Sequence, residues 1–257
     1  MRKYGRILLM AVLVAGLATS ALAHEMVLKP GAEKDGKLAV ELHSGHKFIV
    51  PEEVESVERI KAGLFKDGAL QEAELKGNDA ELRIDFSVPV QGTSIIIANK
   101  DGGVWSRTNE GGKSGTRKEL EAQGLKVLSA VKYDKFVKLI HNPSKDDTSF
   151  ATVTGQALEL IPETNPADLK VGDFLKVKIM VNGNQPYSGP VWATWDGFAP
   201  EVEETYAYYT VAAQGEALIK ITAPGLWGIR AMKSDLPGKE GEYDALSLRS
   251  FLMFEVK

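Results

Sequence analysis

The sequence predicts an all-β protein: two consecutive immunoglobulin-like β-sandwich domains that follow a cleaved signal peptide. Alternation of apolar and polar residues at period two recurs along the chain, whereas helical periodicity is rare. In the second half, glycine-containing turns separate short strands at roughly ten-residue intervals, the spacing of a β-sandwich. The chain has 257 residues, and without its leader it is long enough for two cores of about 110 residues each.

Residues 1–23 have the three parts of a signal peptide. A start with three basic residues precedes an apolar run at 7–18, and Ala21 and Ala23 are the small residues that a cleavage site requires. The run is shorter than the roughly 20 apolar residues of a membrane anchor, and no later stretch is apolar enough to span a bilayer. We expect cleavage after Ala23 and a periplasmic protein without direct membrane insertion.

The charge and the cysteine content exclude several classes of function. Loss of the leader removes three basic residues and no acidic one, so the formal net charge changes from −4 to −7. This balance argues against nucleic acid or an anionic membrane as a partner, because both bind basic patches, and it is compatible with collecting cations. The chain has no cysteine, which excludes disulfides and thiolate chemistry.

The first domain, residues 24–150, is expected to hold four alternating strands and a short helix. The strands are predicted at 38–42, 80–90, 93–103 and 133–143. In the first of them Leu38, Val40 and Leu42 face one way, whereas Ala39, Glu41 and His43 face the other.

The expected helix lies at 116–128. There Thr116 and Glu119 form a capping box, and Gly124 keeps the helix short. The glycine-rich stretch 102–115 lacks the strand-loop-helix frame of a phosphate-binding loop and is expected to be a long loop.

The second domain, residues 151–257, follows a polar surface connection at 142–149. Seven short strands are expected in it, at 157–163, 173–183, 189–197, 205–211, 216–225, 226–234 and 247–257. This half has no histidine and the chain has no G-x-S-x-G motif, so no hydrolytic apparatus is expected.

The four histidines, His24, His43, His46 and His141, are the candidate metal ligands, and all lie in the first domain. Cleavage after Ala23 makes His24 the first residue, whose α-amine, with a pKa near 8, loses its proton readily to a metal. Amine and imidazole together offer two nitrogens, and one more imidazole completes a set that favours Cu2+ or Ni2+.

Each of these residues also has a purely structural interpretation. Ser44 and Gly45 can turn the chain so that His43 and His46 approach one point; alternatively, His43 is a solvated outward residue and His46 caps the turn. His141 is either a further ligand or a strand-end histidine bonded to the backbone. Glu25 could add a carboxylate, although adjacent strand residues diverge; the alternative is a surface charge.

Six segments carry a resemblance to a known family: residues 23–30, 44–53, 103–119, 132–139, 155–194 and 216–233. On these segments the chain resembles the periplasmic accessory proteins of nickel or cobalt uptake, a domain-of-unknown-function family described as the periplasmic component of a cobalt transport system. The resemblance implies two β-sandwich domains and divalent-metal handling. By position, His24 and the Gly45-His46 pair fall where this family carries its histidines. Some relatives carry a C-terminal membrane helix, which this chain lacks, so it would act freely or through a partner permease.

The sequence therefore leads to a metal-binding protein and not to an enzyme. The expected function is periplasmic binding of Ni2+ or Co2+ for uptake, with a membrane metal permease as the expected partner. The alternatives are a Cu2+ carrier that uses the N-terminal histidine, a copper-dependent oxidative enzyme acting on polysaccharide, and a structural or adhesive pair of sandwiches without metal.

Overall fold

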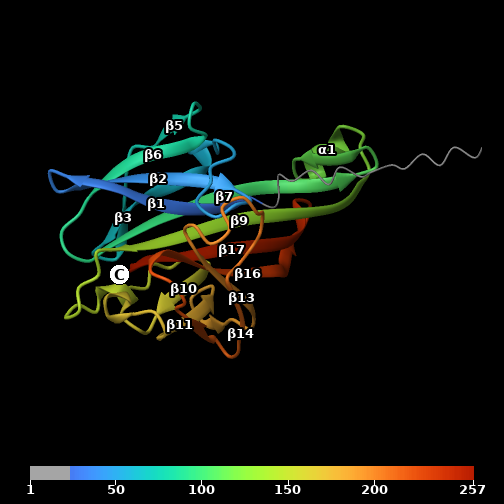
Figure 1. The fold of residues 1–257 in the computed structure, drawn as a ribbon. Coiled ribbons are helices and arrows are strands. Elements are labelled where there is room, and N and C mark those ends of the chain that lie inside the picture. The colour runs from blue at the N-terminus through green and yellow to red at the C-terminus, as the bar shows by residue number, and fades with distance from the viewer. Residues whose placement is uncertain (1–23) are drawn as a thin grey trace, which may run out of the picture.

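The computed structural model describes residues 24–257, and this part of the chain is nearly all β (Figure 1). The predicted all-β, sandwich-like fold class is confirmed. The predicted signal peptide lies outside the described residues. The described strands form three sheets, one of nine strands and two of four.

The nine-stranded sheet, called the central sheet below, runs through the middle of the molecule. Its order is β14-β13-β16-β17-β9-β7-β3-β4, and β8 pairs with β7. Its strands are β3 (Ile60–Lys66), β4 (Ala69–Glu72), β7 (Ser94–Thr108), β8 (Gly111–Ser114), β9 (Val127–His141), β13 (Gly189–Trp195), β14 (Tyr208–Ala212), β16 (Gly225–Lys239) and β17 (Tyr243–Val256).

Two smaller sheets complete the described β-structure. One has the order β1-β2-β6-β5 and comprises β1 (Glu25–Lys34), β2 (Lys37–Gly45), β5 (Lys76–Asn78) and β6 (Arg83–Pro89). The other comprises β10 (Leu158–Pro162), β11 (Phe174–Val181), β12 (Gln185–Pro186) and β15 (Glu216–Lys220). The helices are α1 (Arg117–Ala122) and three 3-10 turns, at Val57–Arg59, Ser149–Ala151 and Pro166–Asp168.

The three sheets stack in layers, with one apolar core on each face of the central sheet (Figure 1). The continuous apolar run in β7 shows why. Ile95 and Ile97 enter the core shared with β10, β11 and β15, whereas Ile96 and Ala98 enter the core shared with β1, β2 and β6. A strand that is covered on both faces needs apolar side chains in both directions, and this run supplies them.

The central sheet contains strands from both sides of the predicted boundary at 150/151. β17 pairs in parallel with β9, for example Leu252 with Lys138, and antiparallel with β16. The division into domains 24–150 and 151–257 stays a prediction. The structure adds that strands of the two halves share one sheet.

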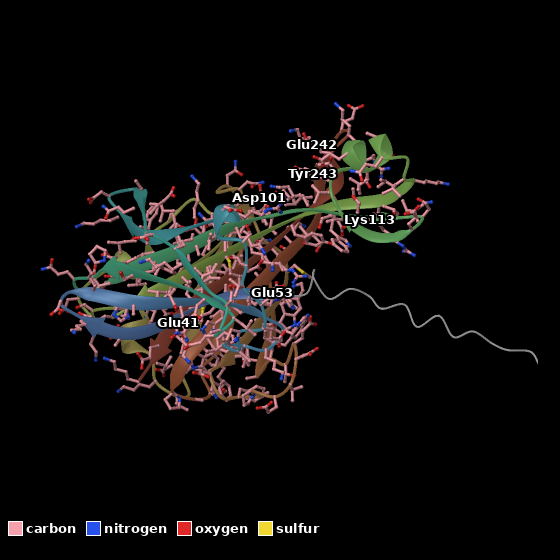
Figure 2. The ribbon with its side chains drawn as sticks, turned by 90° about the horizontal axis from the view of Figure 1, so that it is seen from above. Glu41, Glu53, Asp101, Lys113, Glu242 and Tyr243 are labelled. Atoms are coloured by element: carbon pink, nitrogen blue, oxygen red, sulfur yellow. The ribbon has the colours of Figure 1, made fainter. Side chains whose placement is uncertain are left out.

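A small lobe projects from the layered body (Figure 1). It contains α1, β8 and the ends of β7, β9, β16 and β17; Lys113, Glu242 and Tyr243 mark it in Figure 2. The predicted capping box is confirmed at Thr116 and Glu119, although the helix ends at Ala122.

The expectation of a long loop at 102–115 is wrong: the stretch forms the end of β7, a turn at 109–110 and the whole of β8. β7 passes its glycines through a bulge between Asp101 and Val104. A bulge absorbs residues that cannot keep the register of the sheet, so these glycines do not end the strand.

Candidate metal centre

A β-hairpin brings the first described residue beside His46. β1 and β2 are joined at Asp35 and Gly36, whose φ angles of 52° and 70° suit a two-residue turn that requires positive φ. The pairing places Glu25 opposite Gly45. Because the strands are antiparallel, the residue before Glu25 faces the residue after Gly45, so His24 and His46 become neighbours.

The chain then turns back and adds two carboxylates to this end of the hairpin. Glu52 donates its backbone N–H to Ser44 O at 2.9 Å, and Ser44 forms a β-bridge with Glu53. The return is close: a Cβ on Gly45 would lie 2.6 Å from Val50 O. A glycine at position 45 therefore lets the loop fold tightly against β2.

His24, His46 and Glu52 form a group that could hold a metal ion. One ligand atom from each lies within 4.8 Å of the others, and among the described residues this is the group of three or more histidine, aspartate or glutamate side chains with that property. The two imidazole rings meet edge to face with centroids 4.1 Å apart. Both histidine side chains are 11% exposed and Glu52 is 26% exposed, so the group is partly shielded from solvent.

Hydrogen bonds within the group hold its donor atoms. His46 Nδ1 lies 2.7 Å from Glu52 Oε2, and the backbone N–H of His46 donates to the same oxygen at 3.1 Å. Burial opposes ionisation of Glu52, but these bonds to His46 outweigh it and lower the pKa of the carboxyl below its ordinary value. Glu52 is therefore an anionic oxygen donor at neutral pH.

Glu53 orients the ring of His24. His24 Nδ1 lies 2.5 Å from Glu53 Oε1, whereas Nε2 lies 3.8 Å from Glu52 Oε2. Figure 2 shows Glu53 on the body of the molecule, away from the projecting lobe. A carboxylate accepts from an N–H, so the bond places the proton of a neutral ring on Nδ1 and leaves Nε2 with its lone pair toward Glu52.

His43 lies in β2, two residues before Gly45, and contacts the loop that follows this strand. Its Nδ1 is 2.9 Å from Ile49 O and its Nε2 is 2.9 Å from Glu41 Oε2. The solvated, outward position considered as the alternative for His43 is wrong, because the loop after β2 folds over it and leaves it 3% exposed. Burial lowers the pKa of His43, and the bonds to Ile49 and Glu41 oppose this only in part. The Ile49 φ of 64° is unusual for a β-branched residue.

His141 is far from the other histidines. It ends β9, and its Nε2 lies 3.5 Å from Glu33 Oε2. Glu33 lies near the opposite end of β1 from His24, which at the rise of an extended strand is roughly 30 Å away. The structure thus brings together His24 and His46 of the four predicted ligands, and it does not bring His43 or His141 into the same group.

Behind the candidate site, Glu55 connects the loop to the central sheet. Ser44 Oγ donates to Glu55 Oε1 at 2.9 Å, and Glu55 also pairs with Lys100 and, at 3.4 Å, with Lys135. Burial raises the pKa of Glu55, but the two lysines and Ser44 outweigh that effect and lower it. Burial has the opposite effect on a cation, and it lowers the pKa of Lys135.

Glu25 is not the surface charge considered above. Its side chain is 9% exposed, with Oε1 at 2.6 Å from Arg230 on β16 and at 3.3 Å from Arg249 on β17. Glu25 is not a member of the group of His24, His46 and Glu52, in agreement with the divergence of adjacent strand residues.

The β13–β14 loop approaches the candidate site from the second half of the chain. Glu204 donates its backbone N–H to His46 O at 2.9 Å, and Glu201 lies 3.8 Å from Lys47 Nζ. His46 is thus contacted by Glu204, and the residue after His24, Glu25, is contacted by Arg230 and Arg249. The second half of the chain therefore reaches both sides of the candidate site.

Sequence reasoning missed Glu52 and Glu53. Two adjacent carboxylates after Pro51, six residues beyond His46, were the available signal. These carboxylates point to a metal site only once the hairpin turn at Asp35-Gly36 is recognised, because that turn sets the register that makes His24 and His46 neighbours.

The fold and the site define a layered β-sheet protein with a histidine–carboxylate group at the open end of a hairpin. The chain belongs to the family named domain of unknown function DUF4198, which it matches over residues 21–235. The expectation of a family of unknown function is thereby confirmed, while the role in nickel or cobalt uptake stays a prediction. No match was found among curated proteins. Within residues 24–257, no helix has the length and apolar character needed to cross a membrane.

Proposed function

We propose that the protein binds a divalent transition metal through His24, His46 and Glu52, and that it carries Ni2+ or Co2+ outside the inner membrane for uptake by a permease. The grouping of these three side chains within 4.8 Å is the observation that supports the proposal. Imidazole nitrogens suit nickel, copper, zinc and iron, and an ionised carboxylate neutralises part of the charge of the ion. The choice of nickel or cobalt follows the family resemblance described above.

The partners of the group fit a bound metal. Glu53 accepts from His24 Nδ1, the carboxylate–histidine arrangement that commonly orients a metal-binding imidazole. The net charge of −7 that we expect after leader cleavage also favours a cation as cargo.

Copper is the second candidate metal. The bond between His24 Nδ1 and Glu53 distinguishes its expected binding mode from that proposed for Ni2+ or Co2+. An N-terminal histidine chelates copper through its amine and Nδ1, so that mode requires cleavage after Ala23 and loss of the bond between His24 Nδ1 and Glu53. Binding through Nε2 keeps that bond. The observed orientation of His24 therefore favours the Nε2 mode, in which the terminal amine is not needed.

Calorimetric titration of the chain beginning at His24 with Ni2+, Co2+ and Cu2+ tests the proposal. We expect His46→Ala and Glu52→Gln to abolish or strongly weaken binding, and Glu53→Gln to weaken it by about 10- to 100-fold. His141→Ala is the matched control, since it removes a remote histidine and should bind as the wild type does. Affinity should fall as pH drops through the histidine range near 6.5, because protons compete for the nitrogens.

Two variants distinguish binding through the amine and Nδ1 of His24 from binding through its Nε2. One alanine added before His24 should abolish the amine–Nδ1 mode and leave the Nε2 mode nearly unchanged, whereas Glu53→Gln should do the reverse. If His46→Ala and Glu52→Gln both bind as tightly as the wild type, the site lies elsewhere and the proposal is wrong. The metal content of protein purified from its own periplasm then decides between nickel or cobalt, copper, and a structural protein without metal.

A further inference from the structure

β1 pairs with β2 from its first residue, Glu25, onward. Because β1 is an edge strand of its sheet, its remaining edge depends on contacts with other parts of the chain. Its other edge is held by the central sheet: the backbone N–H of Leu28 donates to the sulfur of Met253 on β17 at 3.2 Å. Nearer to His24, the corresponding contact is made by the side chain of Glu25.

Glu25 is held from the second half of the chain by two arginines. Arg230 lies at 2.6 Å and Arg249 at 3.3 Å from the same carboxylate oxygen. These charges are largely removed from solvent, because Glu25 is 7% and Arg230 8% exposed as whole residues. A buried ion pair gains little stability over apolar side chains of similar volume, so its stabilising contribution alone does not account for the pair.

Arg230 is itself fixed in place. Its guanidinium carbon lies 4.7 Å from the ring centroid of Trp192 and 5.6 Å from that of Tyr206. Trp192 is its cross-strand neighbour in the pairing of β13 with β16. A planar guanidinium can stack on aromatic rings and bind a carboxylate at the same time, which the ammonium of lysine does less well.

The residue that Arg230 holds is adjacent to a candidate metal ligand. The Cα atoms of Glu25 and His24 are about 3.8 Å apart across one peptide bond, so a displacement of Glu25 is passed directly to His24. Misplacement of a metal ligand by about 1 Å is enough to weaken a site that depends on fixed geometry.

We propose that Arg230 is a positioning residue for the metal site: through Glu25 it sets the place of His24, so that the second half of the chain controls metal binding by residues of the first. This inference rests on the proposed function. It assigns to β16 a role in a site to which β16 contributes no ligand.

Titration with Co2+ tests the inference, because its visible absorption reports the geometry of its ligands as well as its affinity. Arg230→Met should weaken Co2+ binding by about tenfold and change the absorption bands, while Arg230→Lys should show a smaller change. Glu25→Gln removes the other partner and should shift the bands in the same way. It also serves as the second variant if Arg230→Met does not fold.

Lys138→Met is the matched control for loss of a buried cation. Lys138 pairs with Glu159 at 2.5 Å, joins β9 to β10 and is 1% exposed. This variant should lose thermal stability and keep the wild-type affinity and absorption bands. A purely structural role of Arg230 predicts the same pattern for Arg230→Met.

The outcomes separate the two proposals. If the wild type binds Co2+ and folded Arg230→Met and Glu25→Gln keep its affinity and bands, the inference is wrong and the proposed function stands. If the wild type binds Co2+, Ni2+ and Cu2+ no better than His46→Ala does, both are wrong. A change in affinity and bands with Arg230→Met, absent with Lys138→Met, supports the inference.

Discussion

Glu55 illustrates how strongly a single buried carboxylate can be held. It pairs with Lys100 and Lys135 and accepts from Ser44, although only 8% of its side chain is exposed. Loss of one member of such a group leaves the remaining charges buried without their counter-ion, which is the costly case for buried ion pairs.

We predict that Glu55→Gln lowers the free energy of unfolding of the metal-free protein by about 3 kcal/mol at neutral pH. It should also flatten the loss of stability in acid. The pKa of Glu55 is below its ordinary value of 4.5 in the folded state. Its contribution is therefore present above that value and is lost as pH falls through the lower folded pKa. Denaturant unfolding between about pH 5 and pH 2 measures the effect.

The control for this experiment is Glu240→Gln, which removes an exposed carboxylate. It should leave both the stability and its pH dependence close to those of the wild type. An acid slope in Glu55→Gln equal to that of the wild type would show that the pairing with the lysines contributes nothing.

Single residues also show what sequence patterns could and could not predict. Leu38, Val40 and Leu42 are buried as their alternation predicts. His43 is buried as well, because burial of the second face of a strand depends on the loop that covers it, and no period-two pattern encodes that loop. Leu82 lies in the strand predicted at 80–90, where the same alternation would turn it inward, yet it is 42% exposed because it precedes the observed strand, which begins at Arg83.

At the scale of elements, the β1–β2 hairpin and the loop from His46 to Glu52 together form the candidate site. The strands and the α1 capping box could be predicted from local patterns, because both depend on residues close in sequence. The pairing of strands could not, since it depends on distant partners. The meeting of His24 with His46 became visible only through the register of the hairpin.

We predict that Gly45→Ala disturbs the site without removing any ligand. The added Cβ would lie 2.6 Å from Val50 O and 3.0 Å from the side chain of Glu52, so the loop must move. We expect weaker metal binding and a loss of about 1–3 kcal/mol in stability. Gly77→Ala is the control, because its Cβ would meet Val54 at an ordinary 3.4 Å. Equal metal affinity in the two variants would contradict the close packing of this loop as a requirement for binding.

At the scale of the whole molecule, the central sheet makes the two halves interdependent. β17 lies between β16 and β9, and its residues contribute to the cores on both faces: Leu252 and Phe254 to one, Phe251 and Met253 to the other. Chain length led to the expectation of one core in each half, whereas each of these two cores contains residues of both halves. The shared sheet could not be predicted, because parallel pairing across more than a hundred residues leaves no local signal.

We predict that a fragment of residues 24–150 does not fold cooperatively. Without β17 the long strand β9 becomes an open edge, and Ile95, Ile97 and Ile140 lose the apolar side chains that cover them. Near-UV circular dichroism and thermal unfolding, with residues 24–257 as the reference, measure this. A sharp unfolding transition in the fragment would instead support the boundary at 150/151 as a true domain boundary.

The position of β17 also governs when the protein can fold. The middle of the central sheet stays incomplete until residues 243–256 have been synthesised, and the pairing of Val131 with Ala245 must close a very long loop. Contacts between such distant residues slow folding. A chain that threads through a secretion pore must stay unfolded until it has crossed. With the export that we propose, the late strand therefore delays folding until the whole chain has arrived in the compartment where it is to bind its metal.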